Sequence, residues 1–199
     1  MTENSTQDPD IRPTVATVAA LNLSYFGVEF AVALAIGSVA LFADSVDFLE
    51  DASVNLLILI GLGWSLAARA RLGMVLAALI LVPGIATLWT AWQQFTAGVT
   101  PEPFALTVTG LGALAVNFTC AALLARHKDN GGSLTRAAFL SARNDVIANI
   151  AIIGAGLATA ASGSLWPDLI VGLGIAAMNL DAAYEVFEEA REEHDEARA

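Results

Sequence analysis

The stretch of sequence that decides the fold of this chain reads Gly37-Ser-Val-Ala-Leu-Phe-Ala-Asp-Ser-Val-Asp-Phe-Leu-Glu-Asp51. It continues into Ala52-Ser-Val-Asn-Leu-Leu-Ile-Leu-Ile-Gly61, whose composition is typical of a helix that crosses a membrane. An aspartate at the centre of such a helix costs roughly 2.5–3.5 kcal/mol on the insertion scale, whereas each Leu or Ile returns only about 0.3–0.6 kcal/mol. Acids kept at this cost usually serve an ion pathway, a proton relay or a buried partner.

These acids share one face of the expected helix. At about 100° per residue, a sector roughly 80° wide contains Asp44, Asp47, Asp51 and Asn55. Glu50 lies well off this stripe. A second polar stripe occurs near residue 145, where positions i, i+4 and i+8 of one helical face are Ser141, Asp145 and Asn149.

The composition predicts an integral membrane protein. The chain has 199 residues, of which 56% are hydrophobic and only 15% are charged, whereas a soluble domain has about 25% charged residues. Six apolar segments are each long enough to cross a hydrocarbon core of about 30 Å, and they span residues 14–36, 39–64, 72–96, 103–126, 135–160 and 166–187. We therefore expect an all-α fold with six transmembrane helices.

The distribution of basic residues predicts the orientation. With the N-terminus inside, eight of the nine Lys and Arg residues fall on the cytoplasmic side, and the three outer connections contain none. Both termini are then cytoplasmic, and the chain divides into an N-terminal tail (1–13), a six-helix transport domain (14–187) and a short acidic tail (188–199). We expect a multi-pass protein of the cell (inner or plasma) membrane. No basic patch suggests nucleic-acid binding, and the single Cys120 excludes a disulfide framework.

The two polar stripes are expected to meet near the midplane of the bilayer. A rise of 1.5 Å per residue places Asp47, Asp51, Ser141 and Asp145 in one layer of two antiparallel helices. Four side-chain oxygens around one small volume suit a divalent cation, so we predict these four residues as metal ligands. Further candidates for an ion pathway, or for completing the shell, are Glu29, Asp44, Asn149 and Asn22.

Like charges in a medium of low dielectric predict an exchange mechanism. Desolvation and mutual repulsion favour protonated acids, and an incoming metal ion must displace those protons. We therefore expect metal and protons to compete for one carboxylate site that opens alternately to each side. A proton gradient would then drive the metal outward.

The residues quoted above resemble the cation diffusion facilitator family. The stretch from Gly37 to Asp51 is similar to its second-helix signature, in which a small-Ser-x-Ala-Leu-x-Ala-Asp run precedes a His/Asp-x-x-x-Asp pair, here Asp47 and Asp51. Ser141-Ala-Arg-Asn-Asp145 falls on the corresponding pair of the fifth helix. The resemblance implies a divalent metal exporter that is not an enzyme, has no cofactor beyond the transported ion, and forms a homodimer, here through its transmembrane helices.

Two departures from the family pattern bear on the substrate. Ser141 stands where the family usually has His or Asp, and only a short acidic tail follows the sixth segment where a cytoplasmic metal-binding domain is usual. Family frequency favours Zn²⁺, or a broad Zn²⁺, Cd²⁺ and Co²⁺ range, whereas an oxygen-only shell favours Mn²⁺ or Fe²⁺. The alternatives left open are a membrane-embedded enzyme with a carboxylate-metal site and a passive channel or scaffold.

Overall fold

The computed structural model describes residues 11–61, 85–126 and 132–196. Apart from short connecting turns, the secondary structure in these ranges is helical. The elements are α1 (Ile11–Ile36), α2 (Val39–Gly61), a helix over 85–97, α4 (Pro103–Ala125), α5 (Gly132–Ser162) and α6 (Trp166–Glu196). The predicted all-α fold is confirmed for this part of the chain. Most of the expected N-terminal tail, the first part of segment 72–96 and residues 127–131 lie outside the described residues.

Three of the described helices are long and apolar enough to cross a membrane: Arg12–Ile36, Pro103–Ala125 and Ser141–Ser162. The six predicted spans and the cytoplasmic position of the termini stay predictions. Helix α6 continues to Glu196 and so includes most of the expected acidic tail 188–199.

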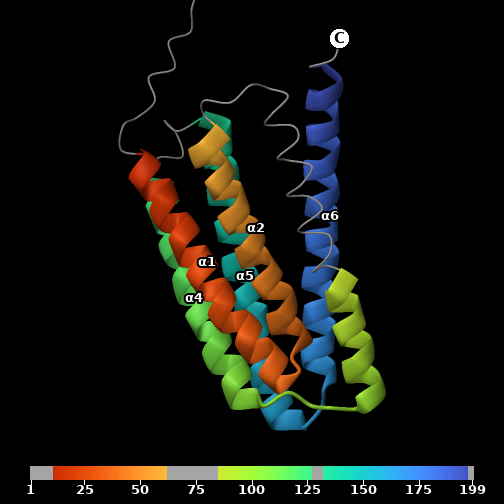
Figure 1. The fold of residues 1–199 in the computed structure, drawn as a ribbon. Helices are drawn as coiled ribbons and strands as arrows, with labels where there is room; N and C mark the ends of the chain where they lie inside the picture. Colours follow the sequence, from red (N-terminus) through yellow and green to blue (C-terminus); the bar gives the residue numbers. More distant parts are fainter. Residues whose placement is uncertain (1–10, 62–84, 127–131, 197–199) are drawn as a thin grey trace, which may run out of the picture.

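The helices form an antiparallel bundle with α2 at its centre (Figure 1). Helix α2 packs against α1, α5 and α6, while α4 packs against α1 and α5. The turns after α1, after residue 97 and after α5 all lie at one end of the bundle, which we call the turn end (Figure 1). These three turns are the connections that the charge pattern predicts to be outside, because they contain no Lys or Arg.

Each turn at the turn end contains a glycine in the left-handed region. The φ values are 68° at Gly37, 64° at Gly98 and 64° at Gly163. Glycine adopts this conformation without the steric cost of a side chain, so it ends a helix and reverses the chain within a few residues. After α1, the Ser38 N–H donates to the Ala33 carbonyl at 3.1 Å, which closes the end of that helix. The turns at Gly37 and Gly163 join helices that pack against each other, α1 with α2 and α5 with α6, whereas the turn at Gly98 leads across the end of the bundle to α4.

A buried acid of α6 caps the first turn of α2. The Asp168 carboxylate accepts hydrogen bonds from Ser38 Oγ (2.6 Å), Val39 N (2.9 Å), Ala40 N (3.3 Å) and Gln94 Nε2 (2.9 Å). Helix N-termini expose backbone N–H groups that need acceptors, and here the acceptor comes from another helix. We call this group of residues the Asp168 clamp. It joins α2, α6 and the helix over 85–97 at the turn end.

Gly172 allows α6 to approach α2 beside the clamp. A Cβ atom at Gly172 would lie 2.6 Å from Ala40 N and 2.6 Å from the Val39 carbonyl carbon, whereas one at Gly174 would meet nothing within 4 Å. We expect Gly172→Ala to lower the free energy of unfolding by roughly 1–3 kcal/mol, because the backbone atoms it meets must move. Gly174→Ala is the matched control, and it should be neutral or slightly stabilising because Ala is the better helix former. Thermal unfolding in detergent measures both, and equal midpoints would contradict the close approach.

Candidate metal centre

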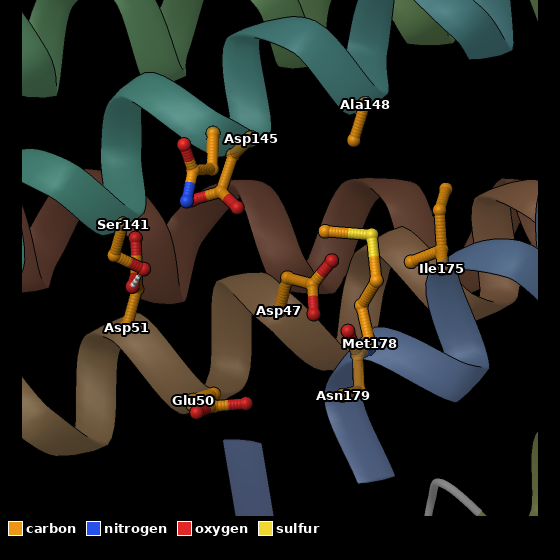
Figure 2. Close-up of a pocket in the computed structure, with 10 residues that line it drawn as sticks. Asp47, Glu50, Asp51, Ser141, Asp145, Ala148, Ile175, Met178 and Asn179 are labelled. Atoms are coloured by element: carbon orange, nitrogen blue, oxygen red, sulfur yellow. Dashed lines mark hydrogen bonds between the residues drawn. The ribbon is translucent and has the colours of Figure 1, made fainter. Parts of the chain in front are cut away.

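The four predicted ligands line one cavity of about 130 Å³ between α2, α5 and α6. Figure 2 shows Asp47 and Asp51 projecting from α2, and Ser141 and Asp145 projecting from the facing side of α5. The i,i+4 spacing within each helix places both members of a pair on the same face. The antiparallel contact of α2 and α5 then turns the two faces toward each other. The structure thus brings together all four residues that the sequence nominated.

Asp51 is the best-connected of the four side chains. Ser141 Oγ donates to Asp51 Oδ1 at 3.0 Å, and Asn22 Nδ2 of α1 donates to Asp51 Oδ2 at 3.3 Å. The Cys120 thiol of α4 donates in turn to Asn22 Oδ1 at 3.4 Å. The carboxyl of Asp145 lies within hydrogen-bonding reach of Asp51. Asn22 of α1, supported by Cys120 of α4, therefore orients this carboxyl as partners outside the coordination shell do in metal sites.

Asp47 lies further along the cavity, on the side of α6 (Figure 2). Among the described residues, no three His, Cys, Asp or Glu side chains are close enough together to hold a metal ion. The Ser141 hydrogen bond to Asp51 is the direct contact within the site, and Asp145 and Asp47 line the cavity beside it. A tetrahedral shell needs oxygen atoms about 2.0–2.2 Å from the ion, so the four residues would have to draw together around it.

The other four candidates do not line this cavity. Asn22 reaches the site only through its hydrogen bond to Asp51. Glu29, Asp44 and Asn149 are fully buried away from the cavity lining, and Asn149 Nδ2 donates to Asp44 Oδ2 at 2.7 Å. Asn149 also accepts from Asn117 Nδ2 of α4 at 3.0 Å. These residues form a second polar cluster that is separate from the predicted ligands.

The cavity also contains residues beyond the four predicted ligands. Glu50 lies off the polar stripe of α2, yet it lines the cavity because α6 covers that side of the helix. Asn144 completes the α5 wall, and α6 contributes Met178 and Asn179. Asn179 Nδ2 donates to the Ala43 carbonyl at 3.2 Å, so it also ties α6 to α2. In the sequence, the polar Asn179 within the apolar first half of α6 was the feature that could have indicated this role.

A family model described as the cation efflux transmembrane domain matches residues 15–193, which is most of the chain. The chain belongs to the cation efflux family. The match confirms the resemblance to the cation diffusion facilitators, and it extends over all the helices described above. No match is found among curated proteins.

Membership of the cation efflux family defines the broad activity. Cation efflux proteins are membrane transporters of divalent metal ions rather than enzymes, so the chain is a divalent cation efflux transporter. The apolar helices agree with a position in a membrane. The identity of the metal, the coupling ion, the ligand set and the homodimer stay predictions.

Proposed function

We propose that this protein exports a divalent metal ion in exchange for protons, and that Asp47, Asp51, Asp145 and Ser141 bind the ion on its way. The observation that carries the proposal is the convergence of these side chains, from two antiparallel helices, on one cavity. Zn²⁺, or a broad Zn²⁺, Cd²⁺ and Co²⁺ range, is the proposed substrate. Mn²⁺ or Fe²⁺ is the second candidate, because all four ligands are oxygen donors.

The charge of the cavity supports proton exchange. Asp47, Glu50, Asp51 and Asp145 line it, and like charges in a low-dielectric medium cannot all stay ionised without a cation or protons between them. An arriving metal ion displaces the protons of the carboxyl groups and binds the resulting carboxylates. When the protons return, they displace the metal. If the cavity opens alternately to the two sides of the membrane, an inward proton gradient drives the metal outward.

The incomplete shell supports alternating access. Ser141 already donates a hydrogen bond to Asp51, whereas Asp47 lies further along the cavity on the α6 side. Ion binding would therefore favour a conformation in which the four side chains draw together. A ligand shifts a conformational equilibrium only by its differential affinity for the two states, and a shell that closes around the ion supplies such a difference.

The proposed function is tested by metal uptake into proteoliposomes. Zn²⁺, Cd²⁺, Co²⁺, Mn²⁺ and Fe²⁺ are compared with and without an imposed pH gradient, and a pH-sensitive dye follows proton movement. We expect saturable uptake that accelerates when the vesicle lumen, into which the metal moves, is more acidic than the outside. Uptake independent of the gradient, with no proton signal, would contradict the exchange. Non-saturable conduction would indicate a channel.

Replacing the neutral ligand should change which metal is preferred. We expect Ser141→His to raise the Zn²⁺ to Mn²⁺ uptake ratio by about tenfold or more, because imidazole suits Zn²⁺ and a tenfold change requires only about 1.4 kcal/mol. Ser141→Ala is the control, since it removes the hydroxyl without adding a nitrogen. Competition between the two metals in the same vesicles gives the ratio. An unchanged ratio in Ser141→His would place residue 141 outside the shell.

We further propose that the protein acts as a homodimer in the inner or plasma membrane, in contact through its membrane helices. The support is the helix over 85–97, on which Ile85, Leu88, Trp89, Trp92 and Phe95 are all exposed. Lipid or a second copy must cover such a surface. Cysteine cross-linking at position 89 in native membranes tests the contact. A chain that stays monomeric in every membrane mimetic would contradict it.

A further inference from the structure

Two buried carboxyl groups lie near each other outside the cavity. Glu29 of α1 and Asp44 of α2 are fully buried, and their side chains lie within hydrogen-bonding reach of one another. Both carboxyl oxygens of Glu29, and Oδ1 of Asp44, have no hydrogen-bond partner. A buried charge needs a counter-charge and donors to offset its lost hydration. Among the described residues, these three buried carboxyl oxygens are therefore left without a hydrogen-bond donor.

Neutral amides hold this pair in place. Asn149 Nδ2 of α5 donates to Asp44 Oδ2 at 2.7 Å, which leaves Oδ1 without a donor. Asn117 of α4 steadies Asn149 with a hydrogen bond of 3.0 Å, and the Asn117 carbonyl oxygen is itself buried without a partner. These amides orient the carboxyl group of Asp44, but they carry no net charge. The charge of the pair is thus left for a ligand to balance.

The pair lies about one helical turn from the candidate metal centre. Asp44 precedes Asp47 by three residues on α2, and Asn149 follows Asp145 by four residues on α5. At 1.5 Å per residue both shifts amount to roughly 4.5–6 Å, and because the helices are antiparallel both point toward the turn end. The structure therefore contains two stacked polar layers, each built from α2 and α5, and α1 adds Glu29 to the second.

We infer that Glu29 and Asp44 form a second divalent cation site, which receives the transported ion between the cavity and the turn end. The inference rests on the proposed function, since it assigns a further station to the same ion. One shared proton would balance only one of the two negative charges. A divalent cation balances both and takes the unpartnered oxygens as ligands. The ion in this pair would thus match the two carboxylates that hold it, while the four carboxylates of the cavity lining face the other ion.

Metal stoichiometry tests the second site. The purified full-length protein is dialysed against saturating Cd²⁺ or Mn²⁺, and the bound metal per chain is measured by mass spectrometry. We expect two ions per chain for the unaltered protein and one for Glu29→Gln or Asp44→Asn. Glu102→Gln is the matched control, because Glu102 is an exposed acid at the start of α4, and it should retain two. One ion per chain in the unaltered protein, or two in Glu29→Gln, would overturn the inference.

The same assay separates this inference from the proposed function. Asp51→Ala should lose the ion of the cavity and keep the ion of the Glu29 and Asp44 pair. If Asp51→Ala keeps both ions, the cavity assignment fails. If Glu29→Gln keeps both ions, only the second site fails.

A measurement on the unaltered protein tests the second site even if a variant does not fold. Two Mn²⁺ ions about one helical turn apart broaden each other's electron paramagnetic resonance spectrum. We expect this broadening to grow as the metal rises from one to two equivalents per chain. A spectrum that stays narrow at saturation contradicts a pair of neighbouring ions.

Discussion

Asp51→Ala should reduce metal uptake in proteoliposomes by more than roughly 100-fold while the protein stays folded. Losing even a group that only supports a metal ligand typically costs 10–100-fold, and Asp51 is proposed as a ligand itself. Its carboxyl also accepts the hydrogen bonds that position Ser141 and Asn22. The substitution therefore removes one ligand and loosens the orientation of another. Initial uptake rates over a range of metal concentrations give the size of the loss.

The control for this prediction is Asp181→Ala. Asp181 is an exposed acid of α6 and is not among the residues that line the cavity, so its removal changes the net charge by the same amount without touching the site. Gel filtration and circular dichroism establish that both variants fold. Uptake by Asp51→Ala at the rate of the Asp181→Ala control would refute the assignment of Asp51 as a ligand.

Asp168→Ala should destabilise the bundle more than Gly172→Ala does. The side chain accepts four hydrogen bonds, from Ser38, Val39, Ala40 and Gln94. Each buried donor left without a partner costs about 1–3 kcal/mol, although some will find new partners after relaxation. We expect a loss of at least about 3 kcal/mol, or a fall in the unfolding midpoint of roughly 6–12 °C for a chain of this size. Thermal unfolding in detergent measures it.

Asp168→Asn provides the graded comparison. Asparagine retains one oxygen acceptor in the same position, so it can still cap α2 while losing the charge and the second acceptor. We expect its midpoint to fall between those of the unaltered protein and Asp168→Ala. If all three proteins unfold at the same temperature, the Asp168 clamp does not stabilise the bundle.

The sequence was sufficient to nominate the four residues that meet in the cavity, because helical spacing is a strong constraint. Two i,i+4 pairs on antiparallel helices can meet only if their depths agree, and depth follows from the rise per residue. The sequence could not show that Glu50 also faces the cavity. The side of α2 on which Glu50 lies is covered by α6, and the contact between α2 and α6 depends on tertiary packing at Gly172.

The role of Asp168 was equally hidden in the sequence. From the pattern alone it is an acid near the start of the sixth segment, next to Trp166 and Pro167. Its contacts lie about 130 positions away along the chain, at Ser38 and Val39. A helix cap supplied by another helix leaves no local signature, since capping rules describe neighbours in the same segment. The separation of Glu29 and Asp44 from the cavity could not be predicted either, because it depends on how α1 packs against α2.

The tight pairing of helices at the turn end has a mechanical consequence. Gly37 joins α1 to α2 and Gly163 lies between α5 and α6, so these four helices form two pairs, each closed by a turn at this end. Asp47 and Asp51 belong to the α1–α2 pair, and Ser141 and Asp145 belong to the α5–α6 pair. The proposed ion would therefore bind at the boundary between the two pairs. Asp168 of α6 links the two pairs by its hydrogen bonds to Ser38 and Val39. We therefore expect the two pairs to separate at the opposite end while the Asp168 clamp is intact, and we expect release of the ion past the turns to require the clamp to open.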